Sequence, residues 1–240
     1  MASRQSDTPE YVAHIGDSRQ YWRDIILGVN DGLVSTFLLV VGVVGGGLNN
    51  SQVLLTGVAG AIAGAVSMAA GEYLATKSQD EILEAELTLE RSHIQHFKDQ
   101  EVDQLRGFFR EMGVEEDHLD NVVAGFEDND EALLNAMAAL EFGFVESERR
   151  SPFMAMAASG LLFFLGALPS VVPFALSTNT NVALAWATGL ALGGLFLVGV
   201  IKARVADSSR IKGGLENMAI AGVGGLIAYW IGDLVGTTLA

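Results

Sequence analysis

Residues 28–47 read GVNDGLVSTFLLVVGVVGGG, an apolar and glycine-rich run with one carboxylate, Asp31. With its flanks it forms a segment, residues 25–48, that is long enough to cross about 30 Å of hydrocarbon, because a helix needs about 20 residues for that distance. The segment therefore predicts a membrane-spanning helix that carries an ionisable group.

Four further segments have the length and composition of membrane spans: residues 53–75, 152–176, 182–201 and 214–234. The chain of 240 residues is 50% hydrophobic and only 18% charged, and its mean hydropathy is +0.36. This composition is too apolar for an ordinary soluble domain. We therefore predict an all-α integral membrane protein with five transmembrane helices per protomer, embedded in a lipid bilayer.

The positive charges predict the topology. All 14 lysines and arginines lie before the first span, between spans two and three, or between spans four and five. Five spans place these three regions on one side, and cytoplasmic loops carry the excess of Lys and Arg. We therefore expect residues 1–22 in the cytoplasm and the C-terminus outside. If the net charge of −15 reflects salt adaptation, the membrane is the plasma membrane of a prokaryote.

An acidic insertion separates spans two and three. It holds 20 of the 29 acidic residues and seven of the Lys and Arg. Its pattern predicts a three-helix cytoplasmic domain: a long helix over residues 77–112 that continues span two, a short one over residues 115–126, and a third that follows a capping cluster and ends near residue 148. The domains are then residues 1–22, 23–76, 77–151 and 152–240.

Three glutamates of the insertion fall on inward positions. Glu90 and Glu101 interrupt an apolar stripe at spacings of three and four, and Glu141 shares a face with Met137. His93 forms a Glu-x-x-His pair with Glu90, a spacing found in carboxylate iron sites of helix bundles. An inward carboxylate is costly unless a cation or hydrogen bonds meet it, so these residues are candidate metal ligands. The expected stripes also include Leu83, Leu87, Ile94, Phe97, Leu105, Phe108 and Met112, and then Leu133, Leu140 and Phe144.

The acidity of the insertion does not by itself require a metal ion. Salt adaptation produces acidic surfaces, and solvated glutamates need no function. A single Glu-x-x-His pair arises easily by chance, and a ferritin-like iron oxidase would need two of them with two further carboxylates. The chain has no cysteine, which leaves oxygen, imidazole and thioether ligands. We expect no enzymatic activity, no resident cofactor and no nucleic-acid partner.

Asp31 has candidate partners on span two. At 1.5 Å per residue, Asp31 lies about 9–10 Å below the cytoplasmic edge, Met68 about 10–12 Å and Glu72 about 6 Å, so the three share a layer. An ionisable residue at this depth costs about 2.5–3.5 kcal/mol and by default marks an ion path. The alternative to an ion path is an acid that is protonated, that extends its carboxylate to the membrane surface, or that pairs with a helix N-terminus. Carboxylates with one thioether suit Fe²⁺ or Mn²⁺.

The spans also contain glycine motifs for close helix packing and two further acidic residues. G-x-x-x-G spacings at residues 28–32 and 60–64 allow helices to approach closely, and a two-fold dimer with span one at its interface would enclose an ion path. Glu216 is expected to begin span five and to complement the positive helix N-terminus. Asp233 is either an exit ligand or an interfacial acid.

Two motifs carry a family resemblance. RDIILGVNDGLVSTF at residues 23–37 and AGAVSMAAGEYLATKSQ at residues 63–79, with the five-span plan and the acidic insertion, resemble the vacuolar iron transporter family. The resemblance implies a dimeric transporter that moves Fe²⁺, and often Mn²⁺, out of the cytosol in exchange for protons. It also implies that Asp31 and Met68 line the ion path.

The chain departs from the plant-type pattern of that family. Gly60 stands where this pattern has a further glutamate, whereas Glu72 is typical of prokaryotic-looking members. His93 and Gln104 replace two glutamates of the insertion site, so we expect it to bind fewer ions or to bind them more weakly. The residues that match the site of the pattern are Glu90, Glu101, Met137 and Glu141.

The leading hypothesis is therefore a transporter that removes Fe²⁺ or Mn²⁺ from the cytoplasm by proton exchange, with Asp31, Met68 and Glu72 as its path. A membrane-anchored sensor or buffer of divalent metals is the alternative. The sequence has no Walker motif, which argues against ATP-driven transport.

Overall fold

The computed structural model describes residues 18–143 and 149–239, which form eight α-helices and no strand. Five helices are long and apolar enough to cross a membrane, which confirms the predicted all-α, five-span plan. These five are α1 (Ser18–Gly45), α2 (Asn50–His96), α6 (Pro152–Leu176), α7 (Thr180–Val205) and α8 (Arg210–Leu239). The insertion adds α3 (Lys98–Glu111), α4 (Glu116–Glu127) and α5 (Asp130–Glu141).

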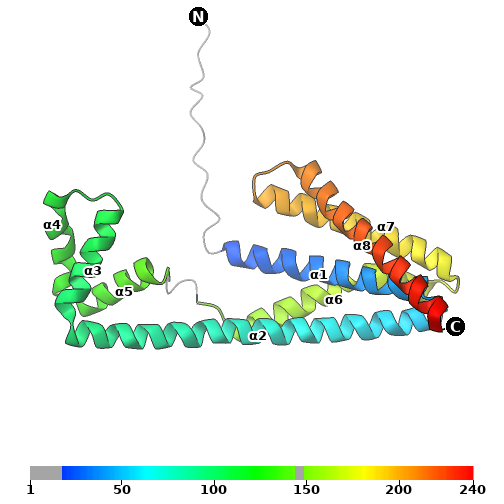
Figure 1. Cartoon of the computed structure of the whole chain (residues 1–240), viewed down its shortest axis with the longest axis horizontal. Helices are drawn as coiled ribbons and strands as arrows, with labels where there is room; N and C mark the ends of the chain where they lie inside the picture. The colour runs from blue at the N-terminus through cyan, green and yellow to red at the C-terminus, as the bar shows by residue number, and fades with distance from the viewer. Residues whose placement is uncertain (1–17, 144–148, 240) are drawn as a thin grey trace, which may run out of the picture.

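Helix α2 joins the two parts of the molecule. Figure 1 shows that it runs from the bundle of α1, α6, α7 and α8 to the cluster of α3, α4 and α5 at its other end. Its 47 residues extend about 70 Å at 1.5 Å per residue, more than twice the thickness of the hydrocarbon. The helix starts with a capping box, in which Asn49 and Gln52 each accept a hydrogen bond from the other's backbone N–H (3.1 and 3.0 Å).

Helix α1 is the central element of the bundle, because it contacts all four other spanning helices. It approaches α6 closely at Gly32, where an added Cβ would lie 2.1 Å from the backbone oxygen of Phe163. No side chain fits that gap. The G-x-x-x-G motif at residues 28–32 therefore packs α1 against α6 within one protomer.

The prediction of one continuous helix over residues 77–112 is wrong, because the helix is interrupted at Phe97. Helix α2 ends at His96, Phe97 has φ −135° and ψ 34°, and α3 begins at Lys98. The break lets α3 turn back onto α5 (Figure 1). Phe97 and Met112, expected to face inward, are 55% and 58% exposed.

The third insertion helix is shorter than predicted. Helix α5 ends at Glu141, and Gly143 adopts a φ of +65°, a left-handed conformation that favours glycine just after a helix. The expected continuation over residues 144–148, including Phe144, lies outside the described residues.

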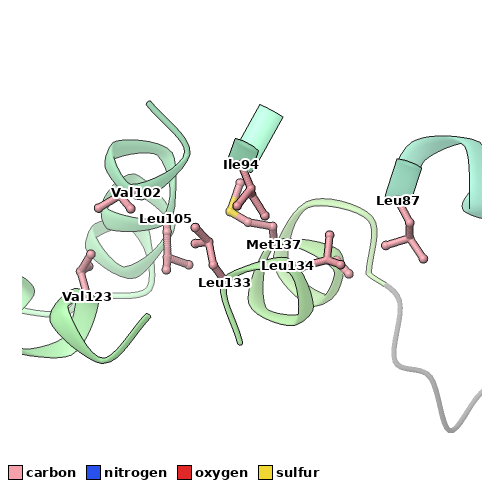
Figure 2. Packing of buried hydrophobic residues seen from close by; sticks show 9 residues of the cluster. Leu87, Ile94, Val102, Leu105, Val123, Leu133, Leu134 and Met137 are labelled. Atoms are coloured by element: carbon pink, nitrogen blue, oxygen red, sulfur yellow. The ribbon is translucent and has the colours of Figure 1, made fainter. Parts of the chain in front are cut away.

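The insertion has its own apolar core, contributed by α2, α3, α4 and α5. Figure 2 shows Ile94 of α2 and Met137 of α5 side by side, with Leu105 of α3 and Leu133 of α5 beyond them. The core consists of Leu87, Ile94, Val102, Leu105, Val123, Leu133, Leu134, Met137 and Ala138. The insertion is therefore a packed unit. Of the apolar positions that the stripes predicted, its core includes Leu87, Ile94, Leu105, Leu133 and Met137, and Leu83, Phe108 and Leu140 pack against it while only partly buried.

Replacing Gly32 by alanine should destabilise the bundle, because the new methyl group would collide with the α6 backbone. Overpacking of this kind costs about 1–3 kcal/mol, so we expect a lower thermal midpoint in detergent. Gly189→Ala on α7 is the matched control, because an added Cβ meets nothing within 4 Å there. Equal midpoints for the two variants would contradict the close contact.

Candidate metal sites

The break at Phe97 assembles a group of metal-ligand side chains in the insertion. Glu90 and His93 lie in the last turns of α2, and Glu101 lies in the first turn of α3. His93 Nδ1 is 3.4 Å from Glu101 Oε1 and 3.8 Å from Glu90 Oε2. In a continuous helix Glu90 and Glu101 would be about 16 Å apart along the axis, so the site depends on the break.

The two carboxylates of this group are buried without enough partners. Glu90 and Glu101 are 4% and 6% exposed, and Glu90 Oε1 and Glu101 Oε2 have no hydrogen-bond partner among the described residues. Burial, followed by the negative charges of Glu101 and Glu141, raises the pKa of Glu90 to about 7. Two buried carboxylates thus share one imidazole as their ion-pair partner, and a bound cation would balance the negative charge that remains.

The spacing of the donor atoms suits one metal ion. One ligand atom from each of Glu90, His93 and Glu101 lies within 4.8 Å of the other two. Ligand atoms on one ion stand at most about 4.4 Å apart when its bonds are about 2.0–2.2 Å long. A contraction of a few tenths of an ångström would complete the site, and oxygen with imidazole suits Fe²⁺ or Mn²⁺.

The other two candidate ligands of the insertion are placed differently. Met137 is fully buried in the apolar core beside Ile94 (Figure 2). Glu141 is exposed, contrary to the expected inward position, and it is not part of the close group. Its negative charge nevertheless contributes to the raised pKa of Glu90.

A second candidate site lies among the spans. A cavity of about 310 Å³ between α1 and α2 has both Asp31 and Met68 in its lining. Phe163 of α6 also lines it, and Ser35 and Ser67 add hydroxyl groups. Asp31 is exposed at the surface of the protomer, so the cavity is open on one side. Carboxylate, hydroxyl and thioether donors thus converge at membrane depth.

Glu72 lies beside this cavity but does not line it. Its Oε1 is 3.8 Å from Nη1 of Arg150, the residue two positions before α6. Arg150 also pairs with Asp24 of α1, which is 5% exposed. Asp24 forms a second ion pair with Arg23, at 3.2 Å. Sequence reasoning missed Asp24, although it stands seven residues before Asp31 and therefore near the same helix face.

The two remaining acids lie outside both sites. Helix α8 begins at Arg210, so Glu216 lies beyond its first turn and the expected role at the helix N-terminus is wrong. Glu216 and Asp233 are both exposed, and neither lines the cavity of Asp31 and Met68.

These features define a multi-pass membrane protein with one carboxylate site among its spans and another in a helical insertion. A model of the VIT family matches residues 22–233, and the chain belongs to that family.

Its relatives include vacuolar iron transporter 1 of Oryza sativa subsp. japonica, which is 28% identical over 215 residues that cover 90% of this chain and 85% of the relative. Vacuolar iron transporter 1 of Arabidopsis thaliana is 27% identical, with coverage of 89% and 85%. The vacuolar iron transporter of Toxoplasma gondii is 26% identical, with coverage of 92% and 76%. The resemblance that the two motifs indicated is thus confirmed.

Glu90→Gln should have opposite effects on stability and on metal binding. Because the folded pKa of about 7 exceeds the ordinary 4.5, the folded state holds this proton more tightly, and stability falls as the pH rises from 4.5 towards 7. In the metal-free protein the substitution should raise the thermal midpoint at about pH 8 and much less at about pH 5. It should also weaken Mn²⁺ binding, measured by calorimetry, by roughly tenfold or more.

Glu86→Gln is the matched control, because Glu86 is exposed one turn earlier on α2. We expect neither effect from it. If Glu90→Gln behaves like Glu86→Gln in both assays, Glu90 is an ordinary solvated residue.

Proposed function

We propose that the protein is a transporter that moves Fe²⁺, Mn²⁺ or both out of the cytoplasm in exchange for protons. The observation that carries the proposal is the cavity lined by Asp31 of α1 and Met68 of α2. The family supports it, since the relatives are named vacuolar iron transporters. The transported ion is cargo, and the proposal includes no resident cofactor and no catalysed reaction.

The donors of the cavity suit a transition-metal ion better than Na⁺ or Ca²⁺. Carboxylate and hydroxyl oxygens bind many cations, whereas the thioether of Met68 favours softer ions. The Ser35 hydroxyl donates to the Asp31 backbone oxygen at 2.5 Å, which leaves its own oxygen available to an ion. Proton exchange follows naturally, because a carboxylate that releases a metal ion can take up a proton.

The proposed transporter is a homodimer. Asp31 is exposed at the protomer surface, and an acid that faced lipid at this depth would be costly. A second copy related by a two-fold axis would cover the open side of the cavity with the same α1 and α2 surfaces. It would also bring a second Asp31 to the path, so that two carboxylates balance the charge of one divalent ion.

In the proposed topology the insertion faces the cytoplasm. The end of the bundle next to the insertion carries Arg23, Arg150 and Lys202, and the α1–α2 loop, the α6–α7 loop and the end of α8 lie at the opposite end (Figure 1). The positive-inside rule then places the N-terminal segment inside and the C-terminus outside. The expected prokaryotic plasma membrane rests on acidity alone, and the vacuolar names of the relatives do not support it.

The insertion site is proposed to collect ions from the cytoplasm through Glu90, His93 and Glu101. A sensor or buffer without transport is the second candidate, and the distance between the two sites favours it. Met68 and Glu90 are on the same helix, 22 positions apart, so about 33 Å of helix separates them. Flux measurements distinguish the two functions.

Asp31→Asn should abolish gradient-driven flux, because the amide neither balances the charge of the ion nor exchanges a proton. The assay is Fe²⁺ and Mn²⁺ uptake into proteoliposomes with an acidic lumen. We expect a loss of at least about tenfold, the effect of removing roughly 1.4 kcal/mol of stabilisation. Glu216→Gln is the matched control: it removes an exposed acid of α8 that is not in the cavity lining.

Flux that survives in Asp31→Asn would contradict the proposed path. Absence of flux in the intact, folded protein, together with metal bound by the insertion, would favour the sensor or buffer.

A further inference from the structure

Arg150 brings its guanidinium between acids of two different spans. Nη2 pairs with Asp24 of α1, and Nη1 is 3.8 Å from Glu72 Oε1 of α2. All three side chains are largely buried, with 15%, 6% and 17% of their surfaces exposed for Arg150, Asp24 and Glu72. A full positive charge is thus held where α1, α2 and the start of α6 meet.

The two acids continue the rows of residues that line the cavity. Asp24 precedes Asp31 by seven residues, which places it about 10 Å nearer the insertion end on nearly the same face of α1. Glu72 follows Met68 by four residues, about 6 Å nearer that end on the same face of α2. The Asp24 and Glu72 pair therefore lies at the mouth of the cavity that contains Asp31 and Met68.

A pair of carboxylates on facing helices is a donor set that divalent cations prefer. The guanidinium of Arg150 now occupies that position, and its planar fork is well suited to carboxylates. A second cation cannot bind both acids while Arg150 holds them, because the two positive charges would repel each other in a site of low dielectric constant.

We propose that Arg150 is a tethered cation that closes the cytoplasmic mouth of the ion path, and that an entering metal ion displaces it from Asp24 and Glu72. The inference rests on the proposed function, because it takes the cavity of Asp31 as the destination of the ion. Arg150 is thus a gating residue, and the two mouth acids are transient ligands.

The neighbouring Arg149 keeps the start of α6 in place when the Arg150 guanidinium moves. Arg149 binds Asp80 and Glu84 of α2 at 3.0 and 2.6 Å. The segment that enters α6 is therefore fastened to α2 independently of Arg150, and release of the Arg150 guanidinium does not detach it.

The test uses the absence of cysteine from the chain. Ser67→Cys introduces a single thiol into the cavity lining, at a depth beyond the mouth. The protein is reconstituted, and thiol-specific methanethiosulfonate reagents are added from the side of the insertion. The rate at which a cationic reagent modifies the new thiol is compared with the rate for a neutral reagent of similar size.

Adding Arg150→Gln should speed the cationic reaction by at least about tenfold, the lower end of the effect that charge in a cleft has on local ion concentration. The neutral reagent should react at an unchanged rate. Arg150→Lys should keep the cationic reaction slow, and Arg149→Gln, which removes the same charge one residue earlier, should have no effect.

An unchanged cationic rate in Arg150→Gln overturns the proposal. An equal increase for both reagents also overturns it, because Arg150 would then be only a structural tie whose loss loosens the mouth. If Arg150→Gln alone fails to fold because the buried Asp24 keeps only the exposed Arg23 as its partner, Asp24→Asn with Arg150→Gln removes both charges, and the same increase is expected. Labelling requires no transport, so this result is independent of the Asp31→Asn flux that decides the proposed function.

Discussion

The contact between Gly32 of α1 and the backbone of Phe163 on α6 positions the functional groups among the spans. A hydrogen at Gly32 is the only side chain that this gap admits. Asp31, one residue earlier, is rotated by about 100° from that contact and so lies in the cavity towards α2. The ring of Phe163 meets Gly64 of α2, where an added Cβ would be 2.3 Å from the ring. Phe163 thus packs its backbone against Gly32 and its ring against Gly64, and it lines the cavity that contains Asp31.

The state of each buried acid distinguishes structural from ion-binding roles. Asp24 is satisfied by two arginines. In contrast, Glu90 and Glu101 each have a buried oxygen without a hydrogen-bond partner in the part of the chain that the structure describes. Their ion pairs among the described residues are with the one imidazole of His93, and no ion pair of Asp31 occurs within the described ranges. Negative charge that is not fully balanced destabilises a folded protein, and its presence at these two places is readily understood if cations bind there.

The spans and the pairing of Asp31 with Met68 could be predicted from the sequence, because both follow from local rules. Bilayer thickness requires long apolar runs, and helical periodicity gives the depth and face of each side chain. The same periodicity predicted that Glu90 and Glu101 face inward, and both are buried.

The break at Phe97 could not be predicted in this way. No glycine or proline lies near it in the stretch ERSHIQHFKDQ, and the apolar spacing continues through it. The break arises from the packing of α3 and α5 against the end of α2, a tertiary effect. The contact between Asp24 and Arg150 joins residues 126 positions apart, which no local pattern indicates.

The most direct test of the central claim, a divalent-cation site at Asp31 and Met68, is anomalous X-ray scattering from crystals of the protein grown with Mn²⁺. We predict a peak within bonding distance of the Asp31 carboxylate and the Met68 sulfur, in addition to one between Glu90, His93 and Glu101. Full occupancy of the insertion site with no peak in the cavity between α1 and α2 would contradict the claim.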